Sequence, residues 1–144
     1  MTDRIHKVLE SWHQIMTGGA SEGLRELLSP ECTFWSPVVH TPQQGRDITF
    51  LYLGAASQVF GTDFRYVRQI IQADSAMLEF ECSIEGIHIN GVDIIQVENE
   101  QITDFKVMVR PLKAVNKVHS GESSSRKPSL APPVIIWCQL SNTL

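Results

Sequence analysis

The spacing of apolar residues changes near the middle of this 144-residue chain, and that change constrains the fold more than any other feature. Before Gly61, apolar residues recur every three or four positions, which is the period of an amphipathic helix. After Gly61 they recur at every second position, the period of a half-buried strand, over four segments: 64–72, 77–85, 87–98 and 102–112. Helices followed by an antiparallel meander predict an α+β fold.

Three helices are predicted before the change of period. The first covers residues 4–16 and ends at Gly18–Gly19, with one apolar side formed by Ile5, Val8, Leu9, Trp12, Ile15 and Met16. A short second helix begins at Ser21 and is expected to end at Ser29–Pro30, because proline cannot continue a helix. The third spans residues 48–60, and its predicted apolar side is Ile48, Leu51, Tyr52, Ala55, Val59 and Phe60.

The strand segments alternate sharply between apolar and polar residues. Residues 77–85 place Leu78, Phe80, Cys82 and Ile84 between Glu79, Glu81, Ser83 and Glu85. A sheet with this pattern buries one face and leaves the other to solvent or to a partner. A further short strand is predicted at 32–36, and Trp35 in it is expected to point to the outer face.

Composition excludes several functions. The net charge of −4 gives no basic surface for a nucleic-acid backbone, and no apolar run approaches the ~18 residues of a membrane helix. The three cysteines, Cys32, Cys82 and Cys138, lack metal-ligand spacing, and the glutamates at 79, 81 and 85 lack a histidine to complete a metal shell. We therefore expect no cofactor, no metal, and buried thiols in a reducing cytoplasm.

The chain changes character after Lys113. Residues 119–129 have the composition of a flexible linker, and residues 132–140 form an apolar segment. Two interpretations stay open: a poorly structured tail, or an added edge strand that pairs within its own subunit or with a neighbour.

Several segments resemble the nuclear transport factor 2-like superfamily, and within it the SnoaL-like small proteins. They are PheTrpSerProVal (34–38), GlyArgAsp (45–47), GlyValAspIleIle (91–95) and the strand segment 101–111. The resemblance covers residues 4–114 and implies one domain at 1–114, followed by a linker and tail at 115–144. It implies a cone-shaped barrel in which three N-terminal helices pack on a strongly curved antiparallel sheet. It also implies a deep apolar pocket and a homodimer through the outer sheet face.

The steroid isomerases of this superfamily resemble the chain across the first strand. Their general base, an aspartate, falls on Ser36, and a hydroxyl with no activating partner cannot move a proton between carbons. The tyrosine that donates to their oxyanion falls on Trp12. Their second donor, a protonated aspartate, falls on Asp93. One of the three positions is kept, so isomerase chemistry is not the preferred hypothesis.

Two other chemistries of the superfamily were compared in the same way. The Asp–Arg–Asp set of its epoxide hydrolases falls on Val107 and near residues 79–81, where no arginine stands. The acid–base group of the SnoaL-type polyketide cyclases is an aspartate or histidine at the pocket. Asp93, His40 and His13 keep that hypothesis open, although His13 is expected to face solvent.

These comparisons lead to three hypotheses. The preferred one is a domain that binds a small hydrophobic molecule, with an unassigned reaction and a pocket lined by Trp12, Phe34, Ser36, Tyr52, Phe80 and Val107. The second is a cyclase or isomerase with Asp93 and His40 as catalytic groups. The third is a protein-interaction module that uses the segment 132–140.

Overall fold

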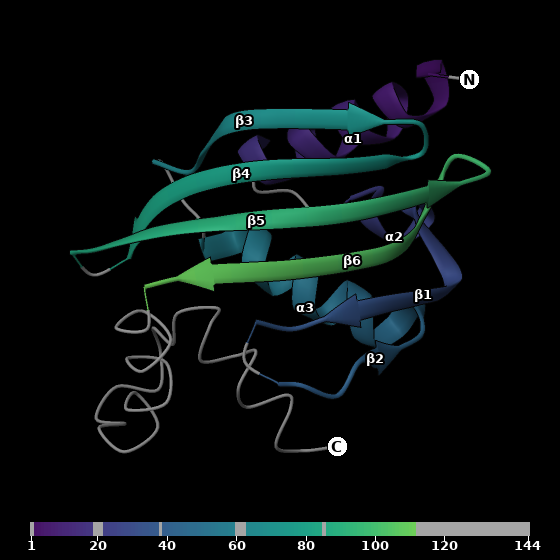
Figure 1. The fold of residues 1–144 in the computed structure, drawn as a ribbon. Helices are drawn as coiled ribbons and strands as arrows, with labels where there is room; N and C mark the ends of the chain where they lie inside the picture. The colour runs from purple at the N-terminus through teal and green to yellow at the C-terminus, as the bar shows by residue number, and fades with distance from the viewer. Residues whose placement is uncertain (1, 19–21, 38, 60–62, 85, 112–144) are drawn as a thin grey trace.

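A curved six-stranded sheet carries the helices on one of its faces (Figure 1). The computed structural model describes residues 2–18, 22–37, 39–59, 63–84 and 86–111. In chain order the elements are α1 (Thr2–Gly18), α2 (Leu24–Leu27), β1 (Leu28–Trp35), β2 (Gln43–Gln44), α3 (Arg46–Val59), β3 (Arg65–Gln72), β4 (Ser75–Ile84), β5 (Ile87–Glu98) and β6 (Gln101–Arg110). The α+β class is confirmed.

The sheet is open, with β2 and β3 at its edges. Its strand order is β2-β1-β6-β5-β4-β3, and the predicted four-stranded meander is the β3–β6 part of it. Neighbouring strands run antiparallel except β1 and β6, which are parallel. The four long strands therefore match the sequence pattern, while β1 and β2 extend the sheet beyond it.

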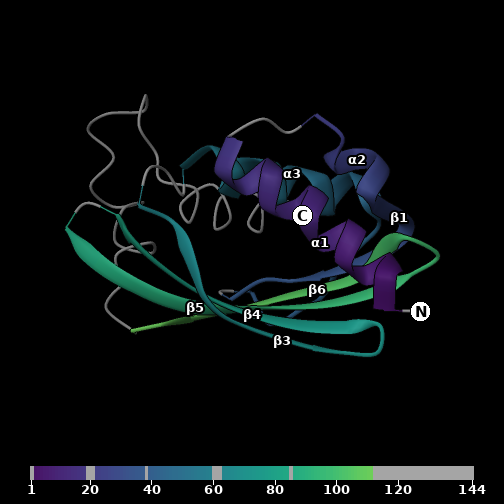
Figure 2. The same cartoon turned by 90° about the horizontal axis from the view of Figure 1, so that it is seen from above.

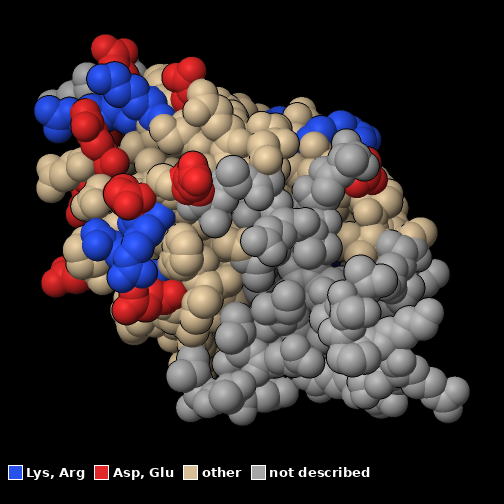
Figure 3. Space-filling model, turned by 180° about the vertical axis from the view of Figure 1, so that it is seen from behind, with Lys and Arg blue, Asp and Glu red and all other residues tan. Residues whose placement is uncertain are grey.

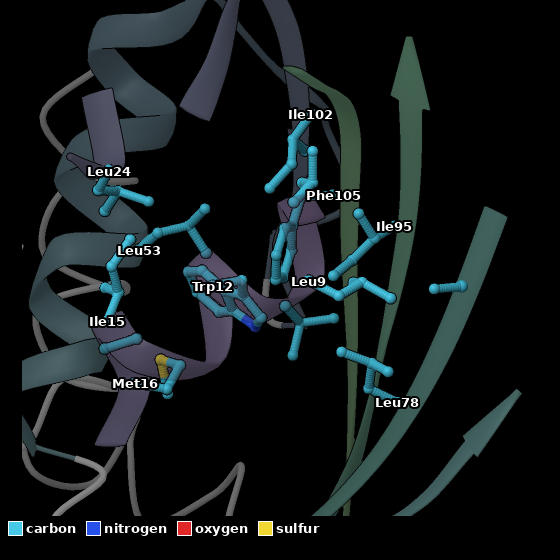
Figure 4. Close-up of a cluster of buried hydrophobic side chains, with 14 of the residues drawn as sticks. Leu9, Trp12, Ile15, Met16, Leu24, Leu53, Leu78, Ile95, Ile102 and Phe105 are labelled. Carbon is cyan, nitrogen blue, oxygen red and sulfur yellow. The ribbon is translucent and has the colours of Figure 1, made fainter. Parts of the chain in front are cut away.

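The hydrophobic core lies between the helices and the inner face of the sheet (Figure 2). The apolar side predicted for α1 is buried in full: Ile5, Val8, Leu9, Trp12, Ile15 and Met16. The sheet contributes residues at every second position, among them Leu78, Phe80, Ile95, Phe105 and Val107. Figure 4 shows Trp12 beside Phe105, and their ring centroids lie 5.0 Å apart with the rings edge to face.

The buried side of α3 differs from the predicted one. Leu51 is 49% exposed, whereas Thr49, Tyr52, Leu53 and Ala56 are buried. Thr49 is buried at no loss of hydrogen bonding, because its Oγ1 donates to the carbonyl oxygen of Gly45 at 2.8 Å. Because Thr49 is polar, the spacing of apolar residues alone predicts a side of the helix that is rotated away from the buried one.

The predicted boundary between the second helix and the first strand is also wrong. The helix ends at Leu27, and β1 begins at Leu28 and runs through Ser29 and Pro30. The pairing of β1 with β6 is interrupted between Leu28 and Thr33, so Pro30 lies where the ladder is irregular. A proline is tolerated there because it has no backbone N–H to donate to a neighbouring strand.

Acidic and basic side chains lie next to one another on the helix side of the molecule (Figure 3). The Arg25–Asp47 ion pair, 2.5 Å, joins α2 to the first turn of α3. No helix in the described part of the chain is long and apolar enough to span a membrane. The linker at 119–129 and the segment 132–140 lie outside the described residues.

Gly91 in β5 allows a close approach between neighbouring strands. It is the cross-strand partner of Phe80, and a Cβ at this position would collide with the Phe80 ring and lie 2.7 Å from the carbonyl oxygen of Met108. Glycine is required here because any side chain would collide with the Phe80 ring and with the backbone of β6. The position is in a strand and not in a turn.

We predict that Gly91→Ala lowers the free energy of unfolding by about 1–3 kcal/mol, the usual cost of overpacking a closed site. Urea denaturation followed by circular dichroism measures this change. Gly54→Ala in α3 is the matched control, because a Cβ there meets nothing within 4 Å. Removal of a helical glycine should raise stability by up to about 1 kcal/mol. Equal effects of the two substitutions would contradict the packing role of Gly91.

Candidate functional site

A buried carboxyl group marks the candidate site. Asp93 lies on the inner face of β5, between its cross-strand partners Leu78 on β4 and Val107 on β6. It keeps 5% of its surface accessible, which places it at the margin of the core. The alternation of β5 puts it on this face with Gly91 and Ile95, so the strand pattern alone directs the carboxyl toward the helices.

Two aromatic residues join Asp93 in a chain of hydrogen bonds. The hydroxyl of Tyr66 on β3 donates to Oδ2 of Asp93 at 2.7 Å. The indole Nε1–H of Trp12 on α1 donates to the same Tyr66 hydroxyl, also at 2.7 Å. A helix and two non-adjacent strands thus contribute one residue each.

Aromatic rings surround Tyr66 and fix its orientation. The ring of His13 lies 5.0 Å from it in a tilted arrangement, and the ring of Phe64 lies 5.1 Å from it, edge to face. Phe80 contacts it edge to face at 6.5 Å. The phenol ring is held on several sides, so its hydroxyl points in one direction.

The surroundings change the acidity of both groups. Burial raises the pKa of Asp93 to about 7, while the hydrogen bond from Tyr66 opposes this rise. Burial, the charge of Asp93 and the hydrogen bond to it raise the pKa of Tyr66 well above its ordinary value. Tyr66 therefore keeps its proton, and Asp93 exchanges its own near neutral pH.

Two polar atoms at the site are left without partners. The second carboxyl oxygen of Asp93, Oδ1, accepts no hydrogen bond from the described residues, and it is not a fully enclosed atom. Nε2 of His13 is enclosed and has no partner. The expectation that His13 faces solvent is therefore wrong: the side chain is half-buried against Tyr66, and burial lowers its pKa.

Five of the six predicted pocket residues are buried between the helices and the sheet: Trp12, Phe34, Tyr52, Phe80 and Val107. Phe34 stacks on Tyr52 with a centroid distance of 4.8 Å, and Phe80 stacks on Phe64 at 5.2 Å. Val107 is the cross-strand partner of Asp93. In the described part of the chain these side chains pack against one another as core.

The structure separates Ser36 and His40 from this packed group. Ser36 follows β1, is half-buried, and accepts a hydrogen bond from the backbone N–H of Val39 at 3.3 Å. His40 is exposed in the connection between β1 and β2. No hydrogen bond or ion pair joins His40 to Asp93 within the described ranges, and the pairing of the two stays a prediction.

Tyr66 was missed by the sequence analysis. One pattern in the sequence could have indicated Tyr66. Phe64, just before β3, and Tyr66 are two residues apart, and this spacing puts both rings on the inner face. The register between β3 and β4 then shifts between Tyr66 and Arg68, and the next residues are mostly exposed. That shift obscured the alternation.

Charged residues pair across neighbouring strands on the outer face. Glu81 and Glu79 form ion pairs with Arg65 and Arg68 of the neighbouring strand β3, at 2.7 and 3.3 Å. Trp35 lies on this face and donates to Oδ1 of Asp104. No group of three His, Cys, Asp or Glu residues in the described ranges has the arrangement of a metal site.

We predict that stability depends on pH through Asp93. Its pKa in the folded protein is about 7, above the ordinary value of 3.8, so the folded state keeps a proton that the unfolded state has lost. The stabilisation is complete below pH 3.8 and is lost as the pH rises through 7. Asp93→Asn removes this dependence and preserves an oxygen to accept the Tyr66 hydrogen bond.

The measurement is urea denaturation of both proteins between pH 4 and pH 8. The stability of Asp93→Asn relative to the wild type should rise with pH, by up to about 4 kcal/mol over the interval between the two pKa values. A difference that is constant across this range would contradict a buried, neutral Asp93.

Comparisons with known proteins agree with this fold. The SnoaL-like domain family matches residues 9–105. A steroid Δ-isomerase from Pseudomonas aeruginosa is similar at 34% sequence identity and a TM-score of 0.72, covering 76% of this chain and 82% of that one. An uncharacterised bacterial protein with a cystatin-like fold from Silicibacter pomeroyi DSS-3 is 29% identical, with a TM-score of 0.67 and coverage of 77% and 78%.

A nuclear transport factor 2-like protein from Mesorhizobium loti is 18% identical, with a TM-score of 0.70 and coverage of 76% and 93%, and shows the fold alone. No curated protein sequence matches the chain. The family match over residues 9–105 and the 34% identity to a solved structure carry the assignment. This chain belongs to the SnoaL-like domain family of the nuclear transport factor 2-like superfamily.

Proposed function

We propose that this protein binds a small hydrophobic molecule that carries a hydrogen-bond acceptor such as a carbonyl group, and that neutral Asp93 donates to that acceptor. The observation that supports this is Oδ1 of Asp93: it lies among apolar residues, is accessible, and has no partner in the described part of the chain. A neutral carboxyl in such surroundings is a strong hydrogen-bond donor.

The apolar residues around Asp93 support a hydrophobic ligand. Its cross-strand partners are Leu78 and Val107, and Phe80 and Phe105 lie on the same inner face of the sheet. A polar ligand would lose its hydrogen bonds to water there and find few protein groups to replace them. A largely apolar ligand with one carbonyl group would lose few such hydrogen bonds. The deep pocket implied by the resemblance is part of this proposal.

The proposal predicts a preference for a ketone over its hydrocarbon analogue. At pH 5.5 the wild type should bind 2-acetylnaphthalene about tenfold more tightly than 2-ethylnaphthalene, the usual effect of one buried hydrogen bond. The preference should disappear by pH 8.5, because ionised Asp93 cannot donate. Ligand fluorescence titration measures both affinities.

Asp93→Leu serves as the comparison, because leucine is similar in size to aspartate but is apolar and has no hydrogen-bond donor. It should bind both naphthalenes equally at either pH. A ketone preference that survives in Asp93→Leu, or none in the wild type, would overturn the proposed function.

A second candidate function is acid–base catalysis by Asp93, as an isomerase or a cyclase of the SnoaL type. The 34% identity to a steroid Δ-isomerase favours it. The position of the isomerases' general base holds Ser36, whose hydroxyl accepts a hydrogen bond from the backbone N–H of Val39 and is not a carboxylate base. Incubation with a β,γ-unsaturated ketosteroid, followed by ultraviolet absorbance of the conjugated product, separates the candidates: ketone binding without turnover favours binding alone.

We further propose that two copies pair through the outer face of the sheet. Ile70, Met77 and Ile94 stand in one cross-strand row on β3, β4 and β5. Ile70 is 54% exposed, Met77 45%, and Met108 on β6 55%. The ion pairs of Arg65 and Arg68 lie beside this apolar row. An apolar centre with a charged rim is typical of a protein interface.

Met77→Lys should convert a dimer to a monomer, because it puts a charge in the middle of this row. Leu51→Lys is the matched control: Leu51 is equally exposed, at 49%, but lies on α3. Light scattering coupled to size-exclusion chromatography gives the mass of each variant. A monomeric wild type, or dissociation by both substitutions, would contradict the proposed interface.

The remaining expectations stay proposals. They are a domain at residues 1–114, a linker and tail at 115–144, and a cytoplasmic location. The third hypothesis, an interaction module that uses residues 132–140, concerns residues outside the described ranges.

A further inference from the structure

The hydrogen bonds at the site run in one direction, from Trp12 through Tyr66 to Asp93. The indole N–H of Trp12 is a donor and cannot accept. It donates to the hydroxyl oxygen of Tyr66 at 2.7 Å and so occupies an acceptor position of that oxygen. The one proton of the hydroxyl then goes to Oδ2 of Asp93, also at 2.7 Å.

This direction decides where the proton of Asp93 resides. Because Oδ2 accepts from Tyr66, the proton of the neutral carboxyl is on Oδ1, the oxygen without a partner in the described residues. The same contact stops the carboxyl from turning. One donor therefore faces one direction, whereas a freely rotating carboxyl would offer either oxygen.

We propose that Tyr66 is the positioning residue of this site: it holds Asp93 so that a single protonated oxygen faces the acceptor group of the ligand. This inference rests on the proposed function, and it assigns the selectivity for one correctly placed carbonyl to Tyr66. The rings of His13, Phe64 and Phe80 hold the phenol, and the indole N–H of Trp12 donates to its oxygen.

Few other titratable groups share this face of the sheet. In the described part of the chain they are His13 on α1, Cys32 on β1, Tyr52 on α3, Tyr66 on β3 and Cys82 on β4. Burial lowers the pKa of His13 and raises the pKa values of Cys32, Tyr66 and Cys82. Asp93→Leu, which lacks the carboxyl, distinguishes a pH dependence that comes from Asp93 from one that comes from His13.

Tyr66→Phe tests the proposal because it removes one hydroxyl and keeps the ring. At pH 5.5 the preference for 2-acetylnaphthalene over 2-ethylnaphthalene should fall several-fold, because the carboxyl is free to turn. The pH at which the remaining preference is lost should move upward, since the hydrogen bond that stabilises the carboxylate is gone. Ile71→Val, a packing change on the inner side of the same strand, should change neither quantity.

A second experiment strengthens the Tyr66 hydroxyl as a hydrogen-bond donor instead of removing it. The chain contains two tyrosines, Tyr52 and Tyr66, and Tyr66 is the one that contacts Asp93. Replacing both by 3-fluorotyrosine makes the hydroxyl a stronger donor. The Asp93 titration, followed by the carboxyl ¹³C shift, should then move to lower pH, and in Tyr66→Phe it should move to higher pH.

Shifts of opposite sign in the two proteins support the positioning role. An Asp93 titration and a ketone preference that are the same in Tyr66→Phe as in the wild type would overturn it. The two proposals fail separately. If the wild type shows no ketone preference, the proposed function is wrong, while the ¹³C titrations still decide whether Tyr66 controls Asp93.

Discussion

The whole structure depends on covering one face of the long antiparallel strands. β4, β5 and β6 present an apolar residue at every second position of their inner face, and α1 lies across that face with its own apolar side buried. Burial of this surface removes water from everything between helix and sheet. A polar group on the inner face therefore loses hydration that few neighbouring groups replace.

Asp93 is the residue for which this constraint has chemical consequences. Removal of water favours its neutral form, and the single hydrogen bond from Tyr66 only partly stabilises its charge. Trp12 is part of the core and also the donor that orients the Tyr66 hydroxyl. Trp12 thus stabilises the core by packing and also takes part in the hydrogen bonds of the site. The stability of the domain and the geometry of the candidate site are therefore linked through this one side chain.

The parts of the fold that repeat a simple period could be predicted from the sequence. The apolar side of α1 and the alternation of β4 are local patterns, and the structure keeps both. Predictions failed where a tertiary contact overrides local preference. Thr49 is buried because the carbonyl of Gly45 accepts its proton, and Pro30 stands in a strand because the ladder is irregular there.

The sequence by itself determined the α+β class, because that class follows from residue spacing along single elements, and the resemblance to the superfamily singled out Asp93. The tertiary structure decided which groups meet that carboxyl. Tyr66 is 27 positions away from Asp93 and Trp12 is 54 away from Tyr66, and they meet because β3 pairs with β4 while α1 crosses the sheet. Residue spacing along the chain does not predict these contacts. They depend on the register between the strands and on how the helix packs against the sheet.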